Sequence, residues 1–397
     1  MSDTANTVQA KPDILRFVKA NIRDYALLIS LLAIMIFFQF TTNGTLFMPV
    51  NMTNIILQNS YIVIMALGML LIIVAGHIDL SVGSVSGFIG AVAAVMMVTN
   101  KIDPIVSVIA CLALGAVIGG IQGYFIAYYK IPAFIVTLAG MLIFKGLALT
   151  VLGGASVGPF PVEFQLLSSG YIADVFGTAG FNTFALLTGF IVTAVIIYFN
   201  FKERRNQQAH GLAEEPDIIF YGRNLLIAVA FIGFSFLMAK YKGLPNVLVV
   251  MFALIALFVF LTTRTTFGRR VYAMGGNEKA AKLSGIDTER LTFLIFTIMG
   301  VLAALAGLIF AARLNVATPK AGLGFELDVI AACFIGGAAT TGGVGKVIGA
   351  VIGAFLMGVM NNGMSIMGIG IDLQQVIKGS VLLLAVFLDV YYKNKAR

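Results

Sequence analysis

Long apolar runs alternate with short polar segments along almost the whole chain. As helices, apolar runs near 20 residues are long enough to cross the roughly 30 Å hydrocarbon core of a bilayer. The pattern predicts spans near residues 25–42, 53–76, 81–99, 104–128, 132–152, 181–200, 224–239, 247–263, 291–312, 343–361 and 372–390. The Gly-rich stretch 328–341 is too short to cross and predicts a broken or re-entrant helix. We therefore expect an all-α polytopic membrane protein with ten to twelve transmembrane helices.

The amino-acid composition is typical of an integral membrane protein. Of the 397 residues, 59% are hydrophobic and only 11% are charged, whereas a soluble domain carries about 25% charged residues. This excludes a soluble globular enzyme. We expect a polar N-terminal segment over 1–24, which lacks the pattern of a removable signal peptide. One transmembrane domain is then expected over 25–390, followed by a tail over 391–397.

The net charge of +8 reflects topology rather than nucleic-acid binding. Basic residues cluster before the first span, in 201–223, in 264–290 and in the tail, whereas 153–180 has none. Because Lys and Arg concentrate on cytoplasmic loops, we expect both termini and the two basic loops in the cytoplasm and 153–180 outside.

The basic loop 264–290 contains a short helix, for which we predict Asn277 as N-cap and Gly285 as C-cap. A helix of about eight residues is marginal in water without packing. In a chain that otherwise lies in lipid, it suggests a docking site for a soluble partner, although capped short helices also occur on ordinary surfaces.

The segment Gly76-His-Ile-Asp-Leu-Ser-Val-Gly-Ser84 ends one span and opens the next. We expect Asp79 or Ser81 to accept hydrogen bonds from free N–H groups at the start of the following helix, whose positive end suits a carboxylate. Direct contact with a polar solute is the alternative.

Two ladders of glycines, each spaced by four residues, predict helix faces on which backbones approach closely. The ladders are Gly115, Gly119 and Gly123, and Gly345, Gly349 and Gly353. General packing is one explanation, and equivalent positions in two halves of an internal repeat are the other.

No catalytic signature is present, and Gly345-Lys346 lacks the first Gly and the Ser/Thr of a phosphate-binding loop. His77 and His210 are too few for a metal site, and Cys111 and Cys333 fall in apolar segments as small buried residues. We expect no cofactor, and any ATP hydrolysis must come from another chain.

The segment Ile78-Asp-Leu-Ser-Val-Gly-Ser84 resembles the signature of bacterial ABC-transporter permeases for ribose, xylose, arabinose and galactose. The similarity continues from about residue 50 to the C-terminus, in Pro132–Gly140, Phe267–Ile286 and Ile335–Gly345. Segments around Tyr241 and Arg264 look most like the xylose and multiple-sugar branch. The resemblance implies an ABC importer permease fold in the bacterial inner membrane.

The resemblance further implies that two permease copies pair, bind two cytoplasmic ATPase subunits and receive a monosaccharide from a periplasmic binding protein. It makes the short loop helix the coupling helix that docks on the ATPase. The expected docking residues are Gly276, Asn277, Glu278, Ala280, Ala281, Leu283, Ser284 and Gly285.

Five amides in or beside apolar spans are candidates for the sugar route, because amides both donate and accept hydrogen bonds as sugar hydroxyls do. They are Gln58, Asn59, Gln122, Asn361 and Asn362. Bonding between helices is the alternative for each. The signature residues Asp79, Ser81, Gly83 and Ser84 are assigned to capping. An ion-coupled secondary transporter is a rival reading, although the acids Asp79, Asp372 and Asp389 lie at span ends. A lipid-modifying membrane enzyme is a second rival, without a catalytic cluster to support it.

Overall fold

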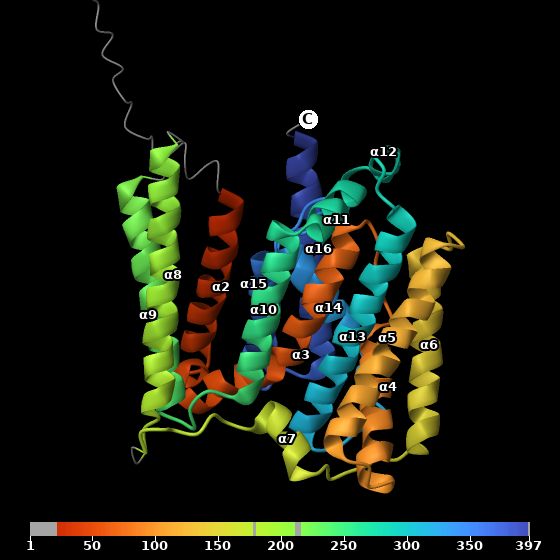
Figure 1. Ribbon diagram of the computed structural model, residues 1–397. Helices are drawn as coiled ribbons and strands as arrows, with labels where there is room; N and C mark the ends of the chain where they lie inside the picture. The colour runs from red at the N-terminus through yellow and green to blue at the C-terminus, as the bar shows by residue number, and fades with distance from the viewer. Residues whose placement is uncertain (1–21, 178–179, 211–215, 396–397) are drawn as a thin grey trace, which may run out of the picture. The chain divides into compact units, whose positions relative to one another are not determined.

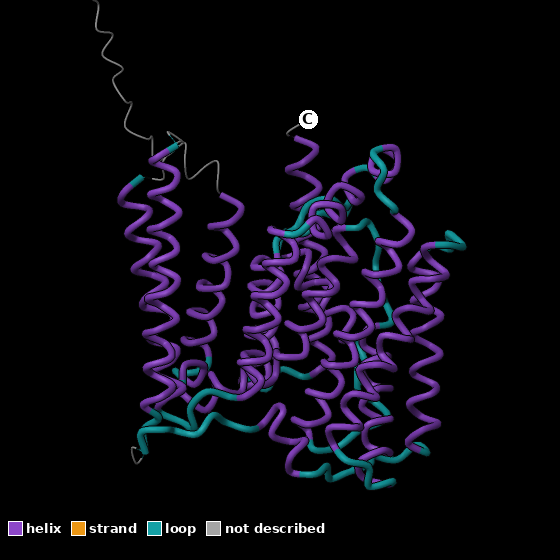
Figure 2. The backbone as a smooth tube through the Cα atoms, viewed as in Figure 1, coloured by secondary structure: helices purple, strands orange, loops and turns teal. Residues whose placement is uncertain are grey.

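The computed structural model describes residues 22–177, 180–210 and 216–395. Most of the predicted segment 1–24 and the last two residues of the predicted tail therefore lie outside the described residues. The described chain forms fifteen α-helices, and it contains no β-strand beyond two isolated backbone bridges. Figure 2 shows helices joined mostly by short loops. The prediction of an all-α protein is confirmed.

Nine of the described helices are long and apolar enough to cross a membrane. They are α3 (Pro49–Val74), α4 with its π-helical continuation (Val82–Thr99), α5 (Pro104–Ala127), α6 (Ala133–Leu152), α8 (Thr183–Ala209), α9 (Asp217–Ala239), α10 (Asn246–Arg264), α13 (Thr288–Leu314) and α15 (Val347–Ile366). The helices α2 (Ile22–Thr41) and α16 (Ile371–Lys395) lie at the first and last predicted spans. Each predicted span thus contains a helix.

Several boundaries differ from the prediction. Helix α9 begins at Asp217, directly after Pro216, rather than at 224, because the proline fixes the helix start before the apolar pattern begins. Helix α7 (Val162–Ser169) lies in a segment read as loop. Helix α16 continues to Lys395, within the predicted tail. Helix α14 (Phe325–Ile335) has only 11 residues and ends inside the stretch 328–341, where a broken or re-entrant helix was expected. The helix begins three residues earlier than predicted, and its depth in the membrane stays a prediction.

The chain divides into two compact units. Of the described residues, one unit contains 22–26 and those within Ile172–Leu244, and the other contains Leu27–Tyr171 and those from Pro245 to Lys395. In the first unit, α8 packs along α9, and Asn200 donates a hydrogen bond to Asn224 at 2.8 Å. A single transmembrane domain over 25–390 stays a prediction.

The second unit contains the same order of helices twice. A long helix, a short helix and a ladder helix follow one another as α3, α4 and α5, and again as α13, α14 and α15. Helix α3 ends beside α11 (Thr266–Gly276) and α13 begins beside it, so the two long helices run in opposite directions (Figure 1). Helix α4 packs on α13, and α14 packs on α3. This arrangement supports an inverted internal repeat.

The two glycine ladders occupy equivalent helices of this repeat but pack on different partners. Gly115 and Gly119 lie against the backbone of α13 at Gly300, whereas Gly349 and Gly353 lie against carbonyl groups of α14. Both are close backbone contacts, as predicted. The prediction is wrong for Gly345, which precedes α15 and meets the side chains of Leu70 and Val74. Helix α3 is buried along most of its length, and the second half of the helix is apolar on every face, as expected for a buried helix.

Candidate coupling site

The short helix predicted in the basic loop is α12 (Glu278–Leu283), with six residues rather than about eight. The Asn277 side chain accepts a hydrogen bond from the Ala280 N–H at 3.0 Å, which confirms Asn277 as N-cap. Ser284, not Gly285, is the C-cap residue. Gly285 follows it with a φ of 82°, because the chain reverses there in a left-handed conformation that suits glycine.

Local backbone hydrogen bonds terminate α12. The Gly285 N–H donates to the Lys282 carbonyl at 3.0 Å, and the Ile286 N–H donates to the Ala281 carbonyl at 3.1 Å. This pair of bonds is a Schellman motif. Two residues later, Asp287 caps α13 by accepting a hydrogen bond from the Arg290 N–H at 2.9 Å. The path from α12 to α13 is therefore fixed by backbone geometry.

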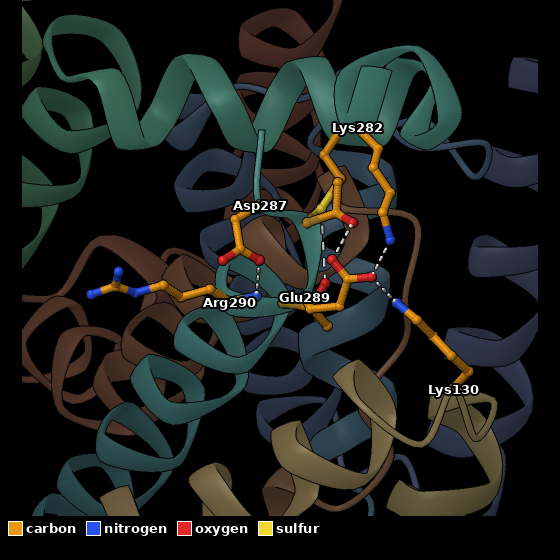
Figure 3. Close-up of polar contacts among 8 residues, drawn as sticks. Lys130, Lys282, Asp287, Glu289 and Arg290 are labelled. Carbon is orange, nitrogen blue, oxygen red and sulfur yellow. Dashed lines mark hydrogen bonds and ion pairs between the residues drawn. The ribbon is translucent and has the colours of Figure 1, made fainter. Parts of the chain in front are cut away.

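A single carboxylate ties α12 to its neighbours. Glu289, in the first turn of α13, lies between Lys282 of α12 and Lys130 of the loop between α5 and α6 (Figure 3). The distance from the Lys130 Nζ to the Glu289 Oε1 is 3.1 Å. The hydrogen bond to Glu289 raises the pKa of the Lys282 amine. Glu289 was absent from the predicted docking residues, since its two partners come from separate parts of the chain.

The predicted docking residues divide into two groups. Leu283 is 90% exposed, and Gly276, Asn277, Glu278, Ala280, Ser284 and Gly285 are also exposed. Ala281, by contrast, is only 5% exposed and packs inside the protein. The expectation that both Ala280 and Ala281 face a partner is wrong for Ala281. The solvent-exposed surface of α12 is centred on Leu283.

Glycines allow α11 to pack closely against the end of α3. A Cβ on Gly275 would overlap the carbonyl oxygen of Val74, the last residue of α3. The same oxygen accepts a hydrogen bond from the Gly343 N–H at 2.8 Å. Tyr272, one turn before Gly275, donates its hydroxyl to the Gly345 carbonyl at 2.7 Å. Two segments that carry the family resemblance thus meet, backbone to backbone, beside α12.

The signature after α3 makes a buried polar cluster. The Asp79 Oδ1 accepts hydrogen bonds from the Ser81 N–H at 2.8 Å and from the Ser81 hydroxyl at 2.7 Å. The Ser81 hydroxyl also contacts the amide of Gln122 on α5, with 3.0 Å between Oγ and Nε2. Burial raises the pKa of Asp79 to about 6. Sequence reasoning placed Gln122 on the sugar route, whereas its amide bonds to this signature.

The capping expectation needs a correction. No side chain caps α4, because Asp79 bonds to Ser81, which is the N-cap residue itself and precedes the helix. Gly83 and Ser84, inside the first turn of α4, are buried. A Cβ on Gly83 would overlap the Gly322 carbonyl. The signature therefore allows close packing of α4 against the loop before α14.

The remaining predicted amides do not share one site. Asn362 exchanges hydrogen bonds with Asn51 across α15 and α3, at 2.9 and 3.0 Å. Asn59 donates to its own helix at Ile55, and its side chain fills the space beside Gly358 of α15. Gln58 is half-buried. Bonding within and between helices explains Asn59 and Asn362.

Asn361 belongs to a different cluster, which sequence reasoning missed. Lys378 of α16 forms an ion pair with Asp328 of α14 at 2.9 Å, and the Asn361 Nδ2 lies 3.5 Å from the same carboxylate. Asp328 is only 8% exposed. The Asn361 Oδ1 is buried and has no hydrogen-bond partner in the described chain. Because Asp328 lies in a short helix after a loop, the span-based survey of acids passed over it.

Both cysteines are buried, as predicted. The Cys333 thiol points to the carbonyl of Ala66, and Cys111 packs in the core between α4, α5 and α13. Among the described residues, His, Cys, Asp and Glu form no group that could hold a metal ion.

Comparison with known proteins places this geometry in a family. Residues 51–386 match the protein family described as "Branched-chain amino acid transport system / permease component". The chain is 40% identical over 377 residues to the xylose transport system permease protein of Haemophilus influenzae, a match that covers 94% of this chain and 98% of that protein. It is 38% identical over 380 residues to the protein of the same description from Escherichia coli K12, covering 95% and 94%.

A more distant relative is the ribose import permease protein of Escherichia coli K12. It is 34% identical over 373 residues, which cover 94% of this chain and 95% of that protein. No solved structure matches the chain. Residues 51–386 contain α12, the signature, α13 and all but the first two residues of α3, so the family match covers the features of this site. The chain belongs to this family of transport-system permease components, together with the xylose and ribose permeases.

Proposed function

We propose that this chain is the membrane-spanning permease subunit of a binding-protein-dependent ABC importer in the bacterial inner membrane. Its substrate is a monosaccharide, xylose or a related pentose or hexose. The relatives that share about two fifths of their residues with it over nearly the whole chain are xylose permeases, which supports this substrate class. The proposed partners are an ABC ATPase subunit, a periplasmic sugar-binding protein, a second permease copy and membrane lipid.

The observation that carries the proposal is the geometry of α12. The helix presents the exposed Leu283 to solvent, while caps and Glu289 fix its angle to α13. An aliphatic side chain that enters a pocket of the partner can anchor an interface when a rigid element holds it in position. Movement of the bound ATPase would then be transmitted to the start of α13, and through Lys130 to the loop between α5 and α6.

In the proposed mechanism, ATP binding closes the partner ATPases and draws two copies of α12 together. The long helices α3 and α13 lie against each other, with Met299 and Leu302 packed around Gly68. Reorientation at the cytoplasmic ends of these helices would open one side of the membrane domain as the other closes.

In this proposal the chain itself performs no covalent chemistry, and both of its termini lie in the cytoplasm.

The test is co-purification. The tagged chain would be expressed with its genomic neighbours and purified in mild detergent. We expect an ATPase subunit in about a one-to-one ratio, and a loss of at least about tenfold on Leu283→Glu, as for an anchor residue of an interface. Leu283→Met is the matched control and should retain the complex. Ala281→Glu is unsuitable, because Ala281 is buried and its replacement would disturb this chain.

Substrate would be tested in liposomes that contain the purified complex. With the binding protein added, labelled xylose should enter only in the presence of ATP. Full uptake by the chain without an ATPase would overturn the importer and support ion-coupled transport. Uptake of ribose with no uptake of xylose would change the substrate but retain the proposed mechanism.

A further inference from the structure

Three aromatic rings meet in the half of the larger unit that lies away from α12. The ring of Tyr61 on α3 lies 5.1 Å from that of Phe310 on α13 and 4.3 Å from that of Phe325 on α14, measured between centroids. The last two rings are 5.0 Å apart. Helix α13 follows α12 and ends at Leu314, one turn beyond Phe310. In the proposed topology, the three rings therefore lie in the outer half of the membrane domain.

Each ring has a polar side chain one turn away on the same helix. The pairs are Gln58 and Tyr61, Phe310 and Arg313, and Phe325 and Asp328. Residues three apart lie on one helix face, so three helices each bring a ring and a polar group to the same region. The Tyr61 hydroxyl lies within electrostatic reach of both Arg313 and Asp328.

Most of these polar groups lack a hydrogen-bond partner in the described chain. The Gln58 amide, the Tyr61 hydroxyl and the Arg313 guanidinium make no hydrogen bond there, although all three residues are half-buried. The buried Asn361 Oδ1, whose amide lies beside Asp328, has no partner either. Because polar groups withdrawn from water are costly to leave unpaired, this region suits a ligand that supplies the missing hydrogen bonds.

Only one face of α3 is open, and that face is polar throughout. From Asn51 to Val74, every residue of α3 is buried except Asn54, Gln58 and Tyr61. Their spacing of four and three places them on one side of the helix. Hydrocarbon does not satisfy such groups, and polar residues inside a membrane face protein or a water-filled space. The open face of α3 is therefore turned away from lipid.

Charges of both signs are interspersed around the rings. Asp328 is paired with Lys378, and Glu326 lies within electrostatic reach of Asp328 and of Lys145 on α6. With Arg313 added, neither sign dominates, which favours a neutral polar solute over an ion. Sugar hydroxyls donate and accept hydrogen bonds, as amide and phenol groups do, and aromatic rings provide apolar surface for the C–H groups of a ligand.

We propose that Gln58, Tyr61 and Arg313 form the site at which a monosaccharide first contacts this chain, with the Asn361 Oδ1 as the next partner on the α12 side of the rings. The inference rests on the proposed function, and it adds the residues that receive the sugar from the outer face. The rings would hold the apolar side of the sugar while the three polar groups bind its hydroxyls.

The main experiment measures the number of ATP molecules hydrolysed per xylose taken up, in liposomes that contain the permease, the ATPase and the binding protein. Gln58→Leu/Tyr61→Phe removes the amide and the hydroxyl but keeps an apolar side chain and the ring. Uptake should fall at least about tenfold, as for the loss of two hydrogen bonds, while ATP hydrolysis stays close to that of the unchanged complex. A purely structural defect would instead lower uptake and hydrolysis together.

Tyr124→Phe is the matched control, because Tyr124 lies in the membrane-spanning α5 and its hydroxyl also makes no hydrogen bond in the described chain. The control should keep the ratio of ATP to xylose. An equal ratio in Gln58→Leu/Tyr61→Phe would overturn this inference alone, whereas no ATP-dependent sugar uptake by the unchanged complex would overturn the proposed function and the inference with it. If the double variant does not assemble, the two changes are made singly, and an unchanged ratio in both overturns the inference.

Arg313 distinguishes a sugar contact from an interaction with lipid headgroups. It lies one residue before the end of α13, where a long basic side chain can reach the membrane surface. Contact with the sugar predicts that Arg313→Gln raises the ratio of ATP to xylose several-fold and that Arg313→Lys restores part of the uptake. An unchanged ratio in Arg313→Gln would show a headgroup contact only and overturn the site as proposed.

Access from outside is tested without transport. Gln58→Cys should react with a membrane-impermeant thiol reagent added to the outer face of right-side-out vesicles. Cys111 and Cys333 are buried, so the background reaction should be low. Leu142→Cys, at an exposed apolar position of the spanning helix α6, should react much more slowly because lipid covers it. If Gln58→Cys reacts no faster than Leu142→Cys, with or without ATP, the proposal is wrong.

Discussion

Gly275 lies against the backbone carbonyl of Val74, in a space that has no room for a side chain. We predict that Gly275→Ala destabilises the protein by about 1–3 kcal/mol, the usual cost of overpacking a rigid contact. The melting temperature in detergent should fall by several degrees. Gly276→Ala is the matched control, since a Cβ there meets no atom within 4 Å. Equal stability of the two variants would show that α11 moves freely away from α3.

Gly140 of α6 provides a second test of close packing. A Cβ on Gly140 would overlap the amide of Gln122, which bonds to Ser81. Gly140→Val should therefore separate Gln122 from Ser81 and lower stability by about 1–3 kcal/mol. Gly146→Val on the same helix faces open space and should melt close to the unchanged protein. A Gly140 variant that melts like the Gly146 variant would mean that Gln122 is not held in this cluster.

Glu289→Gln should weaken the link between α12 and its neighbours. Because the side chains of Lys130 and Lys282 are 55% and 61% exposed, each ion pair contributes little to stability. We expect the ATPase to bind a few-fold more weakly at low salt, and the difference should shrink at high salt because ions screen exposed charges. Asp287→Asn keeps a good cap and serves as the control. A salt-independent defect would point to a role other than charge pairing.

The Asp328–Lys378 pair predicts a non-additive result. Lys378→Met leaves the buried Asp328 without its cation, which costs about 3–5 kcal/mol for a buried pair. Asp328→Asn/Lys378→Met removes both charges and should be much closer to the unchanged protein in thermal stability. If the double variant is as unstable as Lys378→Met, the ion pair is not what the single change disrupts.

Asp79 predicts a pH dependence of stability. Its pKa in the folded protein is about 6, above an ordinary value of about 3.9, so the folded state holds the proton more tightly. Its contribution is fully present below about pH 4 and is lost as the pH rises through 6, up to about 3 kcal/mol. Asp79→Asn removes this loss and should melt at a higher temperature than the unchanged protein at pH 8. The difference in melting temperature between Asp79→Asn and the unchanged protein should become smaller toward pH 4.5. A difference that does not change with pH would contradict the titration of Asp79.

The sequence was sufficient for features that depend on nearby residues. The spans follow from the length of apolar runs, and α12 follows from the N-cap Asn277 and from Gly285, which reverses the chain one residue after the C-cap Ser284. Contacts between distant segments were beyond such reasoning. Nothing near Ala281 in the sequence indicates that it faces inward, and the pairing of Asp328 with Lys378 depends on how α14 and α16 pack. Gln122 shows the same limit, because a polar residue in a span fits a solute route and a structural bond equally well.

The Schellman motif of α12 and its link to Glu289 have a consequence for ligand design. A peptide covering only Glu278–Leu283 has six residues and would be largely unfolded in water, since isolated helices shorter than about 12–15 residues are marginal. Such a peptide would lose most of its affinity to the entropy of ordering. A competitor of the proposed ATPase contact should instead extend from Asn277 to Arg290, so that the caps, the Lys282–Glu289 pair and the first turn of α13 preorganise the surface around Leu283.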